Sequence, residues 1–243
     1  MAADIRLILF DSQDPVFHLS TLEAIWRQVD RAAAPETLLI RRLIPCVLIG
    51  GMQRARETVD LEYCRRQGMP VLRRPSQGGA VFLDRGCLVY SLVLSAGEVP
   101  EANPNDLFDR FRLSVVEVLQ GYGISARPRH PNDIEAGGRK MAGLTLTQWY
   151  SVYSLSGTLL VKLDGPTLDR ALGAKVSASL TSVEKELGRE VDQKALAHDL
   201  ARGLSRNFSR RYRLGDLLPE EKETARYLVA AKYGNDDWNR IEA

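Results

Sequence analysis

"RRPSQGGAVFLD" occupies residues 73–84 and places two arginines, a Gly-Gly pair and an apolar run next to one another. Glycines let a backbone approach a ligand closely, and N–H groups exposed in such a turn bind anions. Arginine adds a planar fork of donors that matches carboxylate or phosphate. Because neighbouring side chains of a strand point to opposite faces, one arginine at most is expected to face such a site, and Arg74 lies beside the turn. The pattern alone fits a surface hairpin with solvated arginines equally well.

"NDIEAGGRKMAG", residues 132–143, is the second stretch that carries chemistry. Its Gly-Gly pair predicts a hairpin turn, which brings Asp133 and Lys140 close together. An aspartate is a natural magnesium ligand beside phosphates, and a lysine that points into a pocket stabilises a developing negative charge. Taken alone, a surface hairpin with a solvated lysine explains this stretch better. The first stretch, for its part, lacks the glycine spacing of a P-loop and of a dinucleotide fingerprint.

The composition is that of an ordinary soluble globular protein, with 44% hydrophobic and 26% charged residues among 243. The net charge of +2 lacks the strong basic excess that is usual in nucleic-acid-binding proteins. Cys46, Cys64 and Cys87 have no metal-site spacing, and reduced thiols in a cytoplasmic protein are the simplest interpretation. The N-terminal residues 1–14 resemble neither a signal peptide nor a transmembrane segment. We therefore expect no nucleic-acid or membrane partner.

Hydrophobic periodicity predicts a mixture of strands and helices. Few of the expected helices stand between successive strands, which favours an α+β fold over a doubly wound parallel sheet. We expect mixed, largely antiparallel sheets flanked by helices, in a single domain over residues 1–243 whose residues 190–243 are helical, with no separate accessory domain. Strands are predicted near residues 5–10, 36–42, 45–51, 71–95 and 130–164, and helices near residues 18–32, 58–68, 103–123, 165–173, 192–208 and 219–234.

The two stretches together resemble a known family. "RRPSQGGAVFLD" is similar to the Arg-Arg-x-Ser-Gly-Gly-Gly-Ala-Val-x-His-Asp signature of lipoate–protein ligases and octanoyltransferases. "NDIEAGGRKMAG" resembles their Asn-Asp-Ile segment, which leads to a lysine, a hydrophobic residue and a glycine. "VLIGGMQRARETVDLEYCRRQGMPVLRR", "SLSGTLLVKLD" and "ARYLVAAKYGNDDWNR" extend the likeness over nearly the whole chain, in the family's order. The resemblance implies the α+β catalytic domain shared by biotin and lipoate ligases.

The resemblance implies a cytoplasmic ATP- and Mg²⁺-dependent ligase that works in two steps. Lipoate first attacks ATP to give lipoyl-AMP and pyrophosphate, and a lysine of an acceptor protein then takes the lipoyl group. Lys140 matches the family's lysine that contacts the acyl carbonyl and the α-phosphate, and Asp133 matches the magnesium side. The residues that match the substrate pocket are Arg74, Ser76, Gln77, Gly78, Gly79, Ala80, Val81, Leu83, Asn132, Gly143 and Leu144.

Three activities stay open at this point. Octanoyltransferases form a thioester on a cysteine near or after the lysine motif, but no cysteine follows Cys87 here. Cys46 and Cys64 are predicted core residues and Cys87 is a weak nucleophile candidate, so a ligase is favoured over an acyltransferase that uses a preformed donor. A non-catalytic lipoyl-binding relative is the third alternative. The expected acceptor is a dehydrogenase E2 domain, the glycine-cleavage H protein or a related lipoate-binding carrier. The sequence leaves open whether a small accessory subunit is needed for adenylation.

Departures from the family pattern gather around the same motifs. Gln77 replaces a glycine, Leu83 replaces a histidine, and Ser156 stands where a histidine is frequent. Altered substrate contacts and neutral drift explain these changes equally well. His18, His130 and His198 are predicted to be surface or structural residues. The basic and aromatic residues 206–213 suit either an acidic acceptor or a solvated helix end, and the helix end is favoured.

Overall fold

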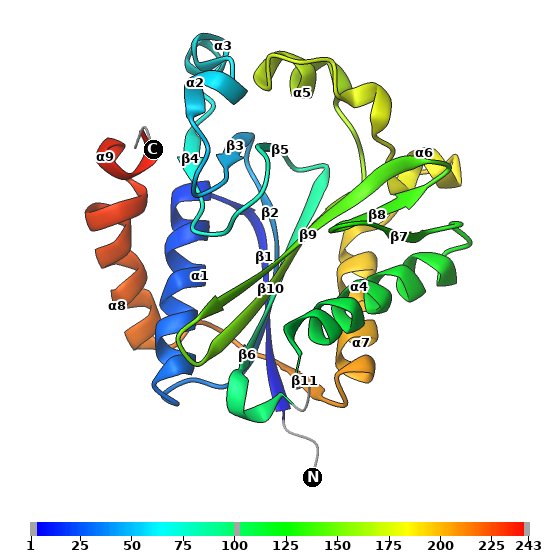
Figure 1. Cartoon of the computed structure of the whole chain (residues 1–243). Helices are drawn as coiled ribbons and strands as arrows, with labels where there is room; N and C mark the ends of the chain where they lie inside the picture. Colours follow the sequence, from blue (N-terminus) through cyan, green and yellow to red (C-terminus); the bar gives the residue numbers. More distant parts are fainter. Residues whose placement is uncertain (1–3, 100–102, 241–243) are drawn as a thin grey trace.

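A mixed sheet forms the centre of the computed structural model, which describes residues 4–99 and 103–240 (Figure 1). In these residues one sheet has the strand order β11-β1-β2-β6-β10-β9-β8-β7 and a second has the order β4-β3-β5. In the large sheet, β1 pairs in parallel with β2 and β11, whereas the other pairings are antiparallel. The α+β prediction is therefore confirmed. The strands are β1 (Asp4–Gln13), β2 (Thr37–Leu43), β3 (Cys46–Ile49), β4 (Val71–Arg73), β5 (Val81–Leu83), β6 (Cys87–Ser95), β7 (Arg127–Arg129), β8 (Asp133–Ala136), β9 (Arg139–Trp149), β10 (Val152–Leu160) and β11 (Arg211–Leu214).

Helices cover both faces of the large sheet. Leu38 and Ile40 of β2 pack in the cluster that includes α4 and α7, whereas Leu39 packs with α1. This alternation explains why residues 38–40 of β2 are all apolar, since both faces of the strand are buried here. The longer helices are α1 (Pro15–Asp30), α4 (Pro104–Gly121), α7 (Gln193–Asn207) and α8 (Pro219–Leu228). The shorter ones are α2 (Ala55–Thr58), α3 (Leu61–Arg66), α5 (Gly165–Ala171), α6 (Val183–Leu187), α9 (Asp236–Asn239), η1 (Ala96–Glu98), η2 (Ser177–Ser179) and η3 (Val229–Tyr233).

Local signals fix where the long helices begin. The Asp14 side chain accepts a hydrogen bond from the Phe17 N–H, and a proline opens α1. Asn103 caps α4 in the same way, again followed by a proline. Such side chains satisfy backbone N–H groups that have no partner inside the helix. The start of α1 matters because this helix borders the cavity described below.

The C-terminal part contains a strand that the sequence analysis missed. Residues 206–213 were expected to end a helix in solvent, but α7 stops at Asn207 and residues 211–214 form β11. The strand joins the sheet edge through parallel pairing with the distant β1. Within the described ranges, no helix is long and apolar enough to cross a membrane.

Candidate functional site

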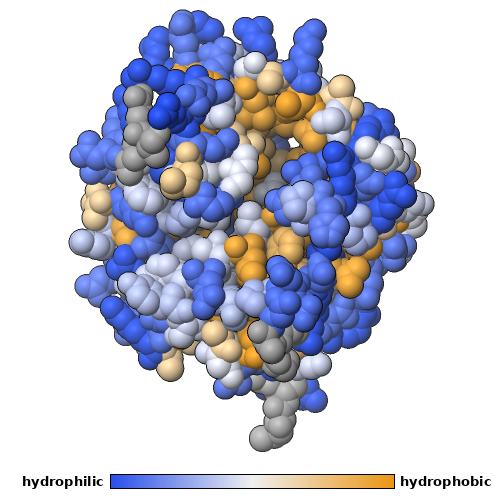
Figure 2. Space-filling model, in the orientation of Figure 1, coloured by the Kyte–Doolittle hydropathy of each residue, from blue (hydrophilic) through white to orange (hydrophobic). Residues whose placement is uncertain are grey.

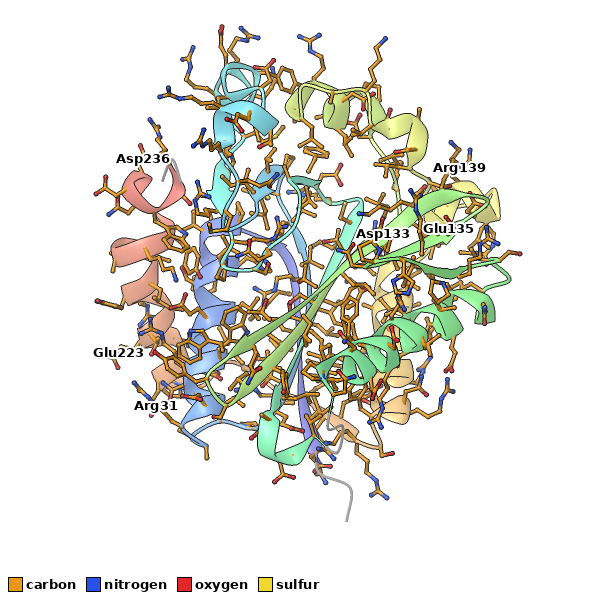
Figure 3. All side chains as sticks on the ribbon, viewed as in Figure 1. Arg31, Asp133, Glu135, Arg139, Glu223 and Asp236 are labelled. Atoms are coloured by element: carbon orange, nitrogen blue, oxygen red, sulfur yellow. The ribbon has the colours of Figure 1, made fainter. Side chains whose placement is uncertain are left out.

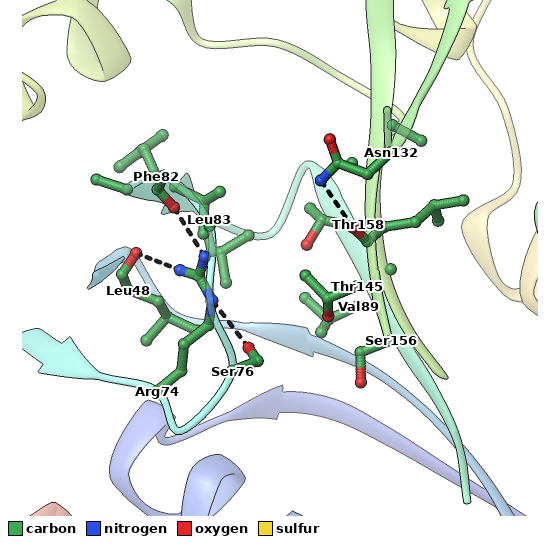
Figure 4. Close-up of a pocket in the computed structure, with 18 of the residues that line it drawn as sticks. Leu48, Arg74, Ser76, Phe82, Leu83, Val89, Asn132, Thr145, Ser156 and Thr158 are labelled. Atoms are coloured by element: carbon green, nitrogen blue, oxygen red, sulfur yellow. Dashed lines mark hydrogen bonds between the residues drawn. The ribbon is translucent and has the colours of Figure 1, made fainter. Parts of the chain in front are cut away.

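A cavity of about 310 Å³ lies between the two sheets (Figure 4). Residues 74–76 and 78–83, from the loop before β5 and from β5 itself, line one side, and β6, β9 and β10 line the other. Helix α1 also contributes residues to the cavity lining. The α5–η2 segment contributes apolar side chains such as Leu168 and Val176. Figure 2 shows apolar residues gathered around a hollow beneath α5. The shape suits a ligand with an apolar part.

The fold brings the two sequence motifs together at this cavity. Two of the predicted residues are not among those that line it. The Gln77 side chain is exposed and lies near Gly51. The Asp133 carboxylate contacts Lys140 Nζ but is not itself among the lining residues. A substrate contact by Gln77 therefore stays a prediction, made for a residue on the loop beside the cavity and not in its lining. The predicted residues that do line the cavity are Arg74, Ser76, Gly78, Gly79, Ala80, Val81, Leu83, Asn132, Lys140, Gly143 and Leu144.

The β8–β9 hairpin positions Lys140. Lys140 Nζ lies 2.7 Å from Asp133 Oδ1, as the hairpin length predicted. A Cβ atom added to Gly143 would lie 3.1 Å from Lys140 Nζ, so the ammonium group lies close to the backbone of this glycine. Asn132 Nδ2 donates to the Leu144 carbonyl at 2.9 Å, which fixes the strand beside it. Figure 3 shows Asp133 near this hairpin, where Arg139 is also labelled. The lysine thus presents a positive charge to the cavity.

Arg74 holds the glycine loop in shape. Its guanidinium donates to Ser76 Oγ and to the carbonyls of Leu48, Gln77 and Gly79, at 2.8–3.1 Å. Burial lowers the pKa of Arg74 to about 10, so the group is cationic at neutral pH. Arg74 faces the cavity as predicted, but these four bonds direct its donors to the loop. The loop conformation, with Gly78 at φ 104°, therefore depends on this side chain.

Arg73 points the other way. It is buried and donates to the carbonyls of Gly50, Gly51, Gln53 and Trp238 at 2.8–3.2 Å. The prediction that at most one of the two arginines faces the site is confirmed.

The sheet side of the cavity is rich in hydroxyl groups. Ser156 of β10 pairs with Ser91 of β6 and with Thr145 of β9, and the two serine Oγ atoms are 2.9 Å apart. Thr147 and Thr158 extend this row along the cavity, and Figure 4 shows Thr145, Ser156 and Thr158 on one side. Ser156 is therefore part of the cavity, as is the buried Leu83 across from it.

Helix α1 supplies residues that the sequence analysis did not assign to the site. His18, Leu22 and Trp26 line the cavity at four-residue spacing, which places them on one face of the helix. His18 was expected at the surface or in a structural role, and it is buried. Burial, followed by the nearby Arg41, lowers the pKa of His18 well below its usual value. Among the other histidines, His130 is exposed and His198 is half-buried.

The three cysteines are buried and are not among the residues that line the cavity. Burial raises the pKa of the Cys46 and Cys87 thiols far above the usual value, and it also raises the pKa of Cys64. A thiol of this kind is a poor nucleophile, because the thiolate is the reactive form. The geometry thus offers no cysteine for a thioester intermediate in the described part of the chain.

No group of three His, Cys, Asp or Glu side chains in the described ranges is placed to hold a metal ion. Asp133 is a single carboxylate beside Lys140. One carboxylate together with substrate phosphates is a usual environment for Mg²⁺. The donor set at Asp133 therefore fits a magnesium ion that arrives with a nucleotide.

Comparisons with known proteins agree with this geometry. The model of the lipoyl protein ligase A/B catalytic domain matches residues 14–205. The chain is 28% identical to lipoate-protein ligase A subunit 1 of Thermoplasma acidophilum, over 96% of this chain and 95% of the relative. It is 29% identical to octanoyltransferase LipM of Symbiobacterium thermophilum, over 89% of this chain and 91% of the relative.

Solved structures are similar over the same length. A lipoate-protein ligase A bound with ATP has a TM-score of 0.90 and 27% identity, covering 99% of this chain and 100% of that one. A putative lipoate protein ligase from T. acidophilum with bound lipoic acid has a TM-score of 0.88 and 27% identity, covering 98% and 100%. A bi-partite lipoate protein ligase from T. acidophilum, described with its E2 lipoyl domain, has a TM-score of 0.88 and 25% identity, covering 99% and 98%.

Proposed function

The chain belongs to the lipoyl protein ligase A/B catalytic domain family, and we propose that it is an ATP-dependent lipoate–protein ligase. The observation that carries this proposal is the position of Lys140. Its ammonium group lies in the cavity beside Asp133, across from the glycine loop that Arg74 holds, while apolar side chains line the rest of the space. This arrangement suits an acid whose apolar chain fills the cavity and whose carboxylate lies beside Lys140, where it can react with a nucleotide phosphate.

The first step joins lipoate to the nucleotide. A carboxylate oxygen of lipoate attacks the α-phosphorus of ATP, the bond to the β-phosphate oxygen breaks, and pyrophosphate leaves. Lys140 offsets the negative charge that builds on the phosphate and carboxyl oxygens. Gly79 has open space where a Cβ would stand, so the loop can lie close to the adenylate. A magnesium ion held by Asp133 would neutralise phosphate charge.

The second step moves the lipoyl group. The neutral ε-amine of an acceptor lysine attacks the acyl carbonyl of lipoyl-AMP, the bond to the phosphate oxygen breaks, and AMP leaves as the amide forms. Negative charge develops on the carbonyl oxygen, which lies near Lys140 when the acyl group fills the cavity. We propose a lipoyl-accepting protein domain as the partner, because the bi-partite relative is described with its E2 lipoyl domain.

A cysteine-dependent acyltransferase is the second candidate, since a relative is named octanoyltransferase. The buried, high-pKa cysteines argue against it. A relative named as a subunit also raises the question of a second subunit for adenylation. We expect such a subunit to affect the first step alone, because the second step starts from the finished adenylate.

The test combines ATP, Mg²⁺, lipoate and a lipoyl-acceptor domain, and follows the acceptor's mass. We expect a lipoyl mass shift that Lys140→Ala abolishes and that Lys162→Ala, at an exposed lysine, preserves. A variant without cysteines is expected to keep the activity. Supplying lipoyl-AMP in place of lipoate and ATP separates transfer from adenylation. Acylation from octanoyl carrier protein without ATP, lost in the cysteine-free variant, would contradict the ligase assignment.

A further inference from the structure

The cavity extends away from Lys140 along β9. Lys140 Nζ sits at the level of Gly143 on β9, and Thr147 is four residues further along. At about 3.3 Å per residue, Thr147 lies roughly 13 Å from the ammonium group. Trp26 stands at the same end, because its ring centroid is 6.5 Å from that of Trp149, at the end of β9. The cavity thus runs from Lys140 to Trp26.

The end of the cavity at Trp26 carries a buried donor without a partner among the described residues. Trp26 is 2% exposed and lines the cavity, and no described residue accepts a hydrogen bond from its Nε1–H. The indole N–H only donates, and a buried tryptophan usually has a partner for it. The hydroxyls of Thr145 and Thr147 line the same part of the cavity. An apolar wall that contains the Trp26 N–H and these two hydroxyls suits a ligand whose far end accepts hydrogen bonds.

The length of the cavity decides which ligand atoms meet Trp26. An extended eight-carbon chain spans about 9 Å between its end carbons, and the last atom adds its own radius. An acyl group whose carbonyl lies at Lys140 therefore ends near Trp26 and Thr147. Octanoate has a methyl group there, whereas lipoate has a dithiolane ring. Thioether-like sulfur is a weak acceptor and packs well against aromatic rings.

We propose that Trp26, through its Nε1–H, makes the cavity select an acyl group with sulfur at its far end, so that lipoate binds in preference to octanoate. The inference rests on the proposed function, since it takes the cavity to be the acyl site. In the empty cavity, water can bond the indole N–H. A hydrocarbon end expels that water and leaves the N–H unpaired, which weakens octanoate binding. A sulfur atom at the same place keeps a partner for the donor.

Isothermal titration with lipoate and with octanoate tests this selection. We expect the chain to bind lipoate about tenfold more tightly, the effect of one unpaired buried donor. Trp26→Phe keeps the ring packing and removes the N–H, so the preference is expected to fall below about threefold, mainly through tighter octanoate binding. Trp149→Phe is the matched control, because Trp149 does not line the described cavity and its removal is expected to leave the preference unchanged.

The result of the titration separates the two proposals. Two results would overturn the role of Trp26. One is equal affinity of the wild-type chain for lipoate and octanoate, and the other is a preference for lipoate in Trp26→Phe that is as large as in the wild type. Binding of neither acid by the wild-type chain would instead overturn the acyl site itself. If Trp26→Phe unfolds, Trp26→Met, which also removes the indole N–H and keeps an apolar side chain, provides the second variant. A full preference of about tenfold for lipoate in that variant would likewise overturn the role of Trp26.

Discussion

Gly143→Ala is expected to disable the site without unfolding the protein. The added Cβ would lie 3.1 Å from Lys140 Nζ, 3.2 Å from Lys140 Cε and 3.8 Å from Asp133 Oδ1. The first two distances are shorter than ordinary van der Waals contact, so the lysine side chain has to move. The residue that moves is flexible and lies at the cavity, which confines the perturbation to the reacting centre.

The size of the effect follows from this geometry. Gly143 lies within β9, where alanine is ordinarily more favourable than glycine by about 0.5–1 kcal/mol. We therefore expect an unchanged or slightly higher melting temperature. A displacement of about 1 Å in a catalytic group costs about 100-fold in rate, so the smaller shift forced here is expected to slow adenylation about 10- to 100-fold. That loss corresponds to about 1.4–2.7 kcal/mol of transition-state stabilisation.

Lipoate-dependent exchange between ATP and pyrophosphate measures this step directly. If adenylation requires a partner subunit, the exchange is run with that subunit present. Gly97→Ala is the matched control, because a Cβ at Gly97 meets no atom within 4 Å. Exchange by folded Gly143→Ala within about twofold of the wild-type rate would refute the reasoning, since a tenfold loss is the smallest effect that we expect. That result would mean that adenylation does not depend on the present position of the Lys140 ammonium group.

Three further predictions concern the surroundings of the cavity. Arg74→Lys keeps a charge but loses the planar fork, so the KM for lipoate is expected to rise about threefold or more; an unchanged KM would contradict this. Cys87→Ala is expected to keep acceptor lipoylation while melting several degrees lower, because it removes buried volume; loss of lipoylation would point to a catalytic thiol. The lowered pKa of His18 keeps its native imidazole neutral, whereas the unfolded chain binds a proton below about pH 6.5. Stability is therefore full above that pH and falls below it. In urea unfolding between pH 7 and pH 5, the wild type should lose about 2 kcal/mol more than His18→Gln, and equal losses would exclude His18 as the cause.

The sequence predicted the parts of the site that depend on local structure. The Gly-Gly turn places Lys140 opposite Glu135, close enough along the hairpin for its long side chain to reach Asp133, although a register shift that the sequence did not predict sets Asp133 opposite Gly143. Strand alternation separated the roles of Arg73 and Arg74, since adjacent side chains must point apart. These predictions needed no knowledge of how the elements pack.

The residues that the sequence missed depend on long-range packing. The spacing of His18, Leu22 and Trp26 shows that they share a helix face, but it does not show that this face borders a cavity. The partner of β11 is β1, at the other end of the chain, and no local pattern specifies that pairing. Gln77 lies on the predicted loop but is not among the residues that line the cavity, because a motif locates a loop and does not give the backbone angles that set the direction of a side chain within a turn.

Arg74 and Lys140 both place a cationic group at the cavity of this nearly neutral chain, but their partners differ. Arg74 is satisfied by a serine hydroxyl and by carbonyl oxygens, which orient the guanidinium without cancelling its charge. Lys140 is different, because the Asp133 carboxylate neutralises it at 2.7 Å. If Asp133 held a magnesium ion, as proposed above, the Lys140 ammonium would no longer be paired with that carboxylate. The positive charge that the proposed first step requires would then come from Lys140 at the cavity, in a chain whose net charge of +2 gives no sign of it.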